Sequence, residues 1–399
     1  MLISLFVSVL LFSGDPAPPA PTSADDEVKA REFSFEIARL LNERDGEALA
    51  AAFDIEALLD RIFDYEGAKK ATRLGFSVPF RMKSSRMGTQ LCNTVMSEGA
   101  WAEPIRLTKN TDGSFNALVR VVRRRDTTFE YIDFRIASKE SRWAISDTLS
   151  SLLPQSNSEY QRDQLYAGRS RAGSEVDQTK AKANRELIQL QSQSEYEAVL
   201  ARLEEVEKTY EHTVFWQAQR IMALGKLGRF EEMSAAVTKA LELDSSRIAA
   251  VMYAYNLSLS AKRFEEAISF LDLIDRWAGE DPYLEFVRGK LYLFLGKVEL
   301  AIENFERSCE EDPYLPAPYR ELLNVGVPRK RWSLVAKTLD GAEKYLGSDF
   351  TALPEAAAWQ GFFASEEGKD WLAAWKLRQA EKAREQSEAE EASEASDDE

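Results

Sequence analysis

The stretch Gly228–Leu243 reads GRFEEMSAAVTKALEL, and it contains the pattern that predicts the fold of the C-terminal half. Its aromatic residue, Phe230, has a bulky apolar counterpart one step of 34 residues back and at three such steps forward. These counterparts are Tyr196, Phe264, Val298 and Trp332. The residue three places further on is also apolar in each copy: Val199, Met233, Ala267, Ala301 and Val335. A fixed period of this kind indicates a protein built from repeated structural units.

The period divides residues 180–345 into pairs of helices. The predicted pairs are Ala183–Gln191 with Tyr196–Tyr210, Val214–Leu227 with Phe230–Leu243, Ile248–Ala261 with Phe264–Ala278, Pro282–Leu295 with Val298–Glu311, and Ala317–Val327 with Trp332–Tyr345. Gly228 and Gly296 stand at matching turns, where glycine tolerates a positive φ, and Lys262 and Lys330 take the alternate turns. One pair cannot bury its own apolar face, so we expect stacked pairs with a continuous core.

The 34-residue period and the bulky-x-x-apolar core resemble those of tetratricopeptide repeat proteins. The resemblance implies a concave groove, lined by the first helix of each pair, that holds a protein or peptide. The residues expected in this groove are Phe215, Met222, Met252, Tyr253, Asn256, Tyr283, Phe286, Lys290, Arg320 and Asn324. Aromatic and Met side chains are typical interface anchors, although half of this set could instead seal one helix against the next. A clamp for a C-terminal carboxylate is not expected, because Glu355 stands where chaperone-binding members need Asn.

The 34-residue step is lost at the end of the repeats, because Trp371 falls 39 residues after Trp332. We interpret Pro354–Arg384 as a capping pair of helices within a solenoid that spans residues 180–384. Its aromatic residues would cover the last repeat: Trp359, Phe362, Phe363, Trp371 and Trp375. The tail at residues 385–399 is acidic and has no large apolar residue, which predicts disorder. It could keep the chain soluble or attract a basic partner.

Residues 27–150 predict an α+β domain, in which helices lie on a curved antiparallel sheet. Apolar residues recur at helical spacing up to Phe63, with Asp54 as a break, and a further helix is expected at Ala68–Met82. After Gly99 the period becomes two, which is typical of strands. The predicted strands are Pro104–Lys109, Ser114–Arg123, Thr128–Ala137 and Arg142–Thr148.

The LLNERDGEALAAAFD opening and the closing Trp-x-Ile strand of this domain resemble the cystatin-like cone of the nuclear-transport-factor-2 superfamily. Such cones often enclose a pocket, and some members are enzymes. Asp133 and Asp147, with Tyr131 beside them, could serve as an acid–base pair in that pocket. The alternative is a solvated strand face. The basic cluster of Arg120 and residues 123–125 could dock an acidic partner or an anionic head group, or could protect a sheet edge from aggregation.

The two remaining segments lie outside these domains. Met1–Phe12 is almost wholly apolar and is as long as a signal-peptide core, although no Lys or Arg precedes it. It would export the chain or hold it at a membrane, and otherwise the protein is cytoplasmic. Asp15–Asp26 is rich in Pro and Ala and predicts an extended tether, so residues 1–26 form no core. Residues 151–179 lack periodicity, which predicts an exposed linker.

The composition excludes several functional classes. The 399 residues carry a net charge of −16, which argues against nucleic acid as a partner. The two cysteines, Cys92 and Cys309, and the one histidine, His212, are too few for most nucleophilic or zinc chemistry. No phosphate-binding glycine loop is present, so no cofactor, metal or catalytic residue is predicted.

The sequence thus favours an exported, non-catalytic scaffold that binds a protein or peptide in the groove. The alternative is ligand binding or catalysis in the N-terminal cone, with the repeats as a docking module; the oligomeric state is left open.

Overall fold

The computed structural model describes residues 24–64, 70–96, 99–122, 128–139, 142–153, 155–166, 174–210 and 212–397. These residues fall into two compact units, with the boundary between Ala254 and Tyr255. The signal-like segment Met1–Phe12, most of the Pro-rich tether and the basic residues 123–125 lie outside the described residues. Within the described residues, no helix is both long enough and apolar enough to cross a bilayer.

The first unit opens with five helices and a four-stranded sheet. The helices are α1 (Ala24–Glu43), α2 (Gly46–Ala51), α3 (Ile55–Ile62), α4 (Lys70–Ser84) and α5 (Met87–Val95), and the strands are β1 (Trp101–Lys109), β2 (Phe115–Val122), β3 (Phe129–Lys139) and β4 (Arg142–Ser150). The strands follow one another in the order β1-β2-β3-β4, all antiparallel. This is the predicted α+β arrangement. Its resemblance to the cystatin-like cone stays a prediction.

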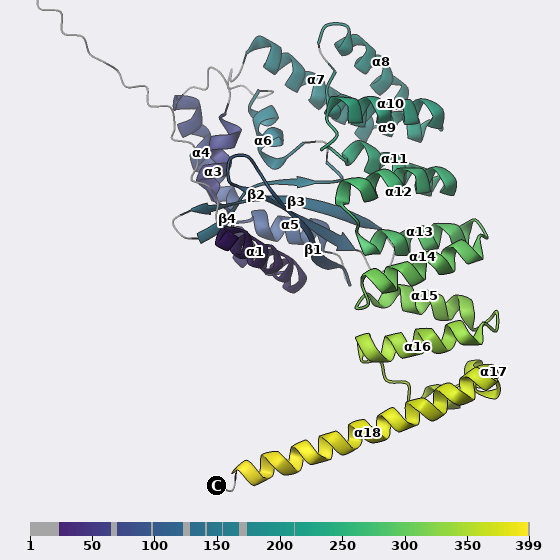
Figure 1. The fold of residues 1–399 in the computed structure, drawn as a ribbon. Coiled ribbons are helices and arrows are strands. Elements are labelled where there is room, and N and C mark those ends of the chain that lie inside the picture. Colours follow the sequence, from purple (N-terminus) through teal and green to yellow (C-terminus); the bar gives the residue numbers. More distant parts are fainter. Residues whose placement is uncertain are drawn as a thin grey trace, which may run out of the picture. The chain divides into compact units, whose positions relative to one another are not determined.

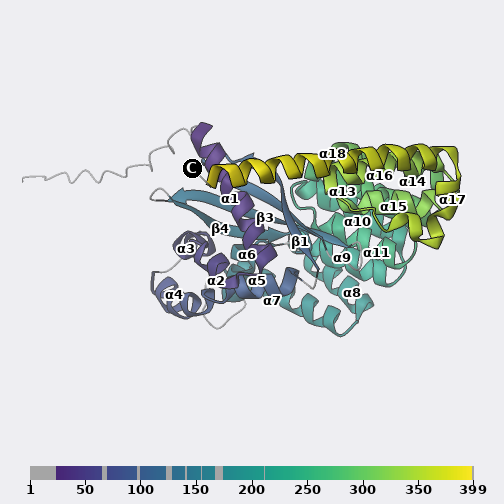
Figure 2. The ribbon, with the colours of Figure 1, turned by 90° about the horizontal axis from the view of Figure 1, so that it is seen from below.

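Helices α1 and α5 cover one face of this sheet (Figures 1 and 2). Ile37 and Leu41 of α1 are fully buried against strand residues such as Phe134. The predicted break at Asp54 is confirmed, since its carboxylate accepts hydrogen bonds from the backbone N–H groups of Glu56 and Ala57 and caps α3. Helix α5 was not predicted, because its short apolar pattern is interrupted by polar residues.

The remaining helices of the first unit are α6 (Asn157–Tyr166), α7 (Glu175–Ser192), α8 (Tyr196–Glu207), α9 (Val214–Lys226), α10 (Phe230–Leu243) and α11 (Ala249–Ser260), the last of which continues past the unit boundary. Helices α8, α9 and α10 match the predicted elements to within three residues. Helices α6 and the start of α7 occupy the predicted linker, which is therefore largely helical in the described residues.

The second unit consists of helices (Figure 1). They are α12 (Phe264–Ala278), α13 (Pro282–Phe294), α14 (Val298–Glu311), α15 (Pro316–Gly326), α16 (Trp332–Leu346), the 3-10 turns η1 (Leu353–Glu355) and η2 (Ala357–Trp359), α17 (Gln360–Ala364) and α18 (Glu366–Asp397). Neighbouring helices from α12 to α16 pack against one another, as the predicted stack of helix pairs requires. Trp371 and Trp375 stack, with ring centroids 5.9 Å apart, in the apolar cluster at the end of the repeats. Helix α18 continues to Asp397, where the sequence predicted disorder.

The same backbone conformation recurs at each turn within a helix pair. Ser194, Gly228, Lys262, Gly296 and Lys330 all have a positive φ, between 54° and 75°. They are spaced by 34 residues, so the turn geometry is periodic even where the residue is not glycine. A non-glycine residue in this region costs about 1–2 kcal/mol, which the packing of the two helices must outweigh.

Candidate functional site

The segment that joins the sheet to the first repeats, residues 151–166, makes polar contacts with parts of the first unit that precede and follow it in the sequence; we refer to it as the connecting segment. It contains α6, whose start is fixed by a reciprocal cap. The Ser156 hydroxyl accepts a hydrogen bond from Glu159 N–H at 3.3 Å, and the Glu159 carboxylate accepts one from Ser156 N–H at 2.7 Å. Ser174 and Asp177 cap α7 in the same way. These Ser-x-x-Glu and Ser-x-x-Asp patterns are the sequence signals that could have predicted both helix starts.

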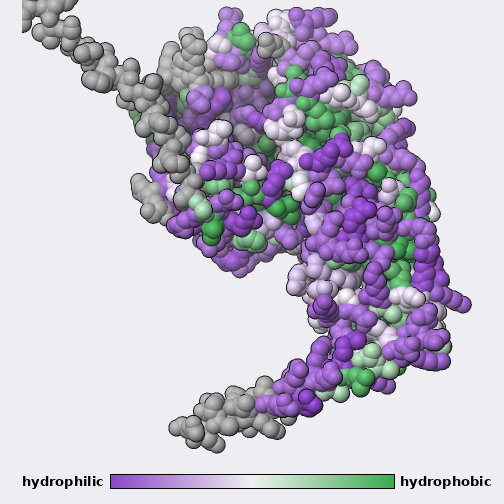
Figure 3. Space-filling view, in the orientation of Figure 1, coloured by the Kyte–Doolittle hydropathy of each residue, from purple (hydrophilic) through white to green (hydrophobic). Residues whose placement is uncertain are grey.

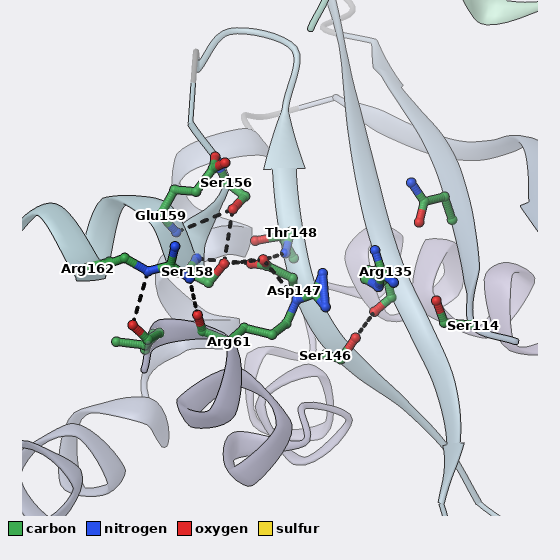
Figure 4. Close-up of polar contacts among 12 residues, drawn as sticks. Arg61, Ser114, Arg135, Ser146, Asp147, Thr148, Ser156, Ser158, Glu159 and Arg162 are labelled. Atoms are coloured by element: carbon green, nitrogen blue, oxygen red, sulfur yellow. Dashed lines mark hydrogen bonds and ion pairs between the residues drawn. The ribbon is translucent and has the colours of Figure 1, made fainter. Parts of the chain in front are cut away.

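Asp147 at the end of β4 holds the first turn of α6 (Figure 4). Its carboxylate accepts hydrogen bonds from the backbone N–H of Ser158, at 3.1 Å, and from the Ser158 hydroxyl. Arg61 of α3 lies 3.5 Å from the same carboxylate. A carboxylate at a helix N-terminus is stabilised by the helix dipole and by unpaired N–H groups. Asp147 is therefore a structural anchor in this arrangement.

Arg162 of α6 binds the C-terminal end of α3 (Figure 4). Its guanidinium donates hydrogen bonds to the carbonyl groups of Ile62, at 3.1 Å, and of Arg61. These are carbonyls of the last turn of α3, which lack partners inside the helix. Leu165 of α6 packs in a small core with residues of α3, α4 and α7. The connecting segment is thus fixed to the helices of the N-terminal domain.

The same segment is fixed to the first repeats. The Arg247 guanidinium donates to both oxygens of the Glu159 carboxylate, at 2.8 and 2.7 Å. Burial opposes ionisation of Glu159, but the hydrogen bonds and the charge of Arg247 outweigh it and hold the pKa of Glu159 below its ordinary value. Two-point Arg–carboxylate pairs are among the strongest polar contacts in proteins.

A second chain of hydrogen bonds reaches deeper into the repeats. The Asp163 carboxylate accepts from the Asn184 amide of α7 at 2.7 Å. The Asn184 carbonyl accepts from the indole N–H of Trp216 on α9, also at 2.7 Å. Trp216 is 1% exposed, so this contact satisfies a donor that is buried from water. Asn184 thereby uses both ends of its amide between the connecting segment and the repeat core.

Tyr253 of α11, one of the residues predicted to face the groove, also contacts the connecting segment. Its hydroxyl donates to the carbonyl oxygen of Leu152 at 2.7 Å. Burial raises the pKa of Tyr253 to about 12, so the hydroxyl stays a donor at neutral pH. The Tyr253 hydroxyl therefore already has a hydrogen-bond partner in this chain, the Leu152 carbonyl.

The other predicted groove residues divide by exposure. Phe215, Met252, Tyr283 and Phe286 are buried. Met222, Asn256 and Lys290 are half-buried, whereas Arg320 and Asn324 are exposed. The buried four pack inside the repeats, which is the alternative that the sequence left open for half of the set. Sequence spacing places a residue on a helix face, but the depth of the neighbouring side chains decides its exposure.

In the second unit, the exposed members of the set, Arg320 and Asn324, lie on α15, and the half-buried Lys290 lies on α13. Lys290 of α13 forms an ion pair with Glu321 of α15, with Nζ and Oε1 3.0 Å apart. Arg320 and Asn324, one helical turn apart on α15, project polar groups into solvent. Phe294, at the end of α13, is 61% exposed and stacks on Phe264. Figure 3 shows a mostly hydrophilic surface over the helices, with apolar side chains in narrow strips.

The predicted acid–base residues of the N-terminal domain have different surroundings. Tyr131 is fully buried, and the Asp147 oxygens are engaged as described above. Asp133 accepts a hydrogen bond from the Asn116 amide at 2.9 Å, and its other oxygen has no hydrogen-bond partner among the described residues. Burial raises the pKa of Asp133 to about 6, against the opposing effects of Asn116 and nearby arginines. The three residues therefore do not form one constellation of free acid and base groups.

The remaining residues singled out by the sequence have structural surroundings. Arg120 is 2% exposed and pairs with Glu103, so it is part of the sheet and not a charged edge. His212 is half-buried, with Nδ1 2.9 Å from the Glu207 carboxylate. Cys92 and Cys309 are both free thiols. Over the ranges that the structure describes, no group of three or more His, Cys, Asp or Glu side chains could hold a metal ion.

The fold thus defines a solenoid of helix pairs that follows an α+β domain. The tetratricopeptide repeat family matches residues 286–314, which confirms the predicted repeat type in this part of the chain. Two solved structures of MamA are similar to this chain, each at 20% identity. The match to the MamA RS-1 ArsTM double mutant covers 42% of this chain and 94% of that chain, with a TM-score of 0.31. The match to MamA 41-end from Desulfovibrio magneticus RS-1 covers 43% of this chain and 98% of that chain, with a TM-score of 0.30. The Cut9–Hcn1 hetero-tetramer of APC/C is similar at 14% identity, over 54% of this chain and 42% of that one, with a TM-score of 0.26. No curated protein matches the chain.

Proposed function

We propose that this protein is a non-catalytic scaffold whose repeats bind extended segments of polypeptide. The observation that carries the proposal is the connecting segment itself. Side chains of α7 and α11 and of the turn before α11 hold a stretch of the same chain through Asn184, Tyr253 and Arg247. The ligand atoms are a backbone carbonyl and two carboxylates, groups that any acidic polypeptide offers. Solenoids of this type form extended binding surfaces.

The site for a second polypeptide is then the accessible surface of α13 and α15. Lys290, Arg320 and Asn324 offer a cation, a fork of N–H donors and an amide. Phe294, four residues after Lys290 on α13, offers exposed apolar area. Such a set suits an extended acidic segment with one apolar anchor. Lys290 would exchange its contact with Glu321 for one with the partner. Export or attachment to a membrane through residues 1–12 belongs to the same proposal and has its support in the sequence.

A peptide selection on the immobilised full chain tests this function. The peptides recovered should be extended, acidic and aromatic-containing. Their affinity should fall about tenfold or more, which is about 1.4 kcal/mol, with Arg320→Ala and with Lys290→Ala. Lys376→Ala is the matched control, because Lys376 is an exposed lysine on α18. Peptides that bind all three variants equally well would place the site on another surface.

The alternative function, a small-ligand site in the N-terminal domain, is favoured by one observation, the buried Asp133 carboxyl with one unpartnered oxygen. A thermal-shift screen of small cationic and hydroxylated ligands on the full chain and on Asp133→Asn tests it. A ligand that stabilises the natural chain but not the variant would support the alternative. If each ligand shifts the melting temperature of the natural chain and of Asp133→Asn by the same amount, the alternative function is wrong.

A further inference from the structure

Helix α4 (Lys70–Ser84) exposes a stripe of large apolar side chains on the surface of the first unit. Leu74, Val78 and Met82 are 69%, 54% and 76% exposed. They are four residues apart, so they lie on one face of the helix, one turn above the next. The opposite face already supplies the core contacts, since Phe76 stacks on Phe80 and meets Phe63 edge-on. The outer stripe is therefore additional to what the fold needs.

The charge around this stripe differs from that of the whole chain. The net charge of the protein is −16, but the sequence from Gly67 to Ser97 contains six Lys and Arg residues and no Asp or Glu. On the described part of α4 and the turn after it, Arg81, Lys83 and Arg86 are exposed and flank the apolar stripe. Arg81 pairs with Glu56, at 2.7 Å, whereas Lys83 and Arg86 have no ion-pair partner among the residues that the structure describes.

An exposed apolar stripe accompanied by basic residues is the pattern of a helix that lies in the headgroup layer of a membrane. The apolar side chains enter the boundary of the acyl region, and the basic side chains contact anionic headgroups. A binding face for an acidic protein would need the cations without so large an exposed apolar stripe. A self-association face would bring like charges together at its rim. The charge complementarity thus favours an anionic lipid surface.

We propose that the outer face of α4 is a membrane-surface site for anionic lipid bilayers. Leu74, Val78 and Met82 insert, and Lys83 and Arg86 bind the headgroups. This proposal does not depend on the polypeptide surface proposed for α13 and α15. The α4 face would also act together with Met1–Phe12 if that segment reaches a membrane, because two weak attachments give stable anchoring where one does not.

The test places a local probe on the full-length chain. Gly75 lies next to the stripe, and a side chain there would meet nothing within 4 Å, so Gly75→Cys can carry an environment-sensitive fluorophore. Cys92 is buried, and burial raises the pKa of Cys309 to about 12, so both react slowly. Leu377→Cys is the matched control, since Leu377 on α18 is 67% exposed. The probe at position 75 should shift to the blue with vesicles of phosphatidylglycerol and phosphatidylcholine, and the control should not.

Two sets of variants then separate the parts of the proposal. Leu74→Ser with Val78→Ser should weaken the response to anionic vesicles about tenfold or more, whereas Leu377→Ser should leave it unchanged. Lys83→Glu with Arg86→Glu should abolish the preference for anionic over pure phosphatidylcholine vesicles, and these exposed positions test the site even if the apolar variant folds poorly. No shift with vesicles, an equal shift with both kinds, or a concentration-dependent shift without vesicles would each overturn the proposal, the last in favour of a second copy.

Discussion

The Glu159 carboxylate and the Arg247 guanidinium, 88 residues apart in the sequence, form a two-point ion pair with both N–O distances below 3 Å. The pair connects α6 to the turn that precedes α11. Both partners are half-buried, so the contact is less screened by water than a surface pair. It joins the segment after the sheet to the first repeats and makes them parts of one compact unit.

This relationship predicts a measurable coupling energy. A double-mutant cycle with Glu159→Gln and Arg247→Met, measured by denaturant unfolding, should give a coupling energy of about 1–2 kcal/mol. Arg229 and Glu232 provide the control, because they form a similar two-point contact but are exposed and three residues apart. Their cycle should give a coupling energy well below that of Glu159 and Arg247, because water screens an exposed pair. Equal energies in the two cycles would mean that the Glu159 contact does not join the two parts of the unit.

The close contact of α13 and α14 predicts that Gly289 tolerates no side chain. A Cβ at this position would lie 2.5 Å from the Phe305 ring and 3.1 Å from the Ala301 carbonyl oxygen. Gly289→Ala should therefore destabilise the second unit by about 1–3 kcal/mol, measured by thermal and denaturant unfolding. Gly75→Ala on α4 is the control for helix propensity, because nothing lies within 4 Å of its Cβ; it should be neutral or stabilising by up to about 1 kcal/mol. A stable Gly289→Ala would show that the two helices can separate freely.

The periodic left-handed turns predict opposite effects at alternate repeats. Lys262 and Lys330 have φ values of 59° and 54°, which are unfavourable for a residue with a Cβ. Lys262→Gly should thus stabilise the protein by up to about 1 kcal/mol, the strain relief being partly offset by the greater freedom of glycine in the unfolded chain. Gly228→Ala, at φ 75° in open space, should destabilise it by about 1 kcal/mol. Midpoints of chemical unfolding measure both, and a loss of stability in Lys262→Gly would contradict the strain argument.

The raised pKa of Asp133 predicts a pH-dependent stability. Because the folded state binds this proton more tightly than the unfolded state, the contribution of Asp133 falls as the pH rises from about 4, the ordinary value, to about 6. The loss should amount to roughly 3 kcal/mol at most. Asp133→Asn removes this titration, so the stability difference between the variant and the natural chain should grow in favour of the variant through that window. A difference that stays constant from pH 4 to pH 7 would show that the pKa is not raised.

The sequence predicted the repeats well because their signal is local and recurs. A helix pair of 34 residues repeats the same apolar positions, and α10, α12 and α14 begin and end at the predicted residues. The four strands were predicted from the alternation of apolar and polar residues, and the predicted bounds differ from the observed ones by up to three residues. Helices α5 and α6 were not predicted, because they are short and their apolar residues are few. The capping pattern Ser156-x-x-Glu159 was the available signal for α6.

The candidate site could be predicted only in part. The family resemblance predicted which helix of each pair would carry the groove residues, but it could not separate Phe286, which is 2% exposed, from Arg320, which is exposed. It also gave no indication that Tyr253 contacts Leu152, because that contact depends on the path of a segment without periodicity.

The sequence by itself determined the two fold classes, the length of the repeat and the places where its turns need a positive φ, since these follow from local periodicity and backbone sterics. Only the tertiary structure decided which apolar side chains are buried, where the connecting segment binds, and that Leu74, Val78 and Met82 remain exposed beside basic residues. These features depend on which surfaces meet, and contacts between residues far apart in the chain leave no regular spacing in the sequence.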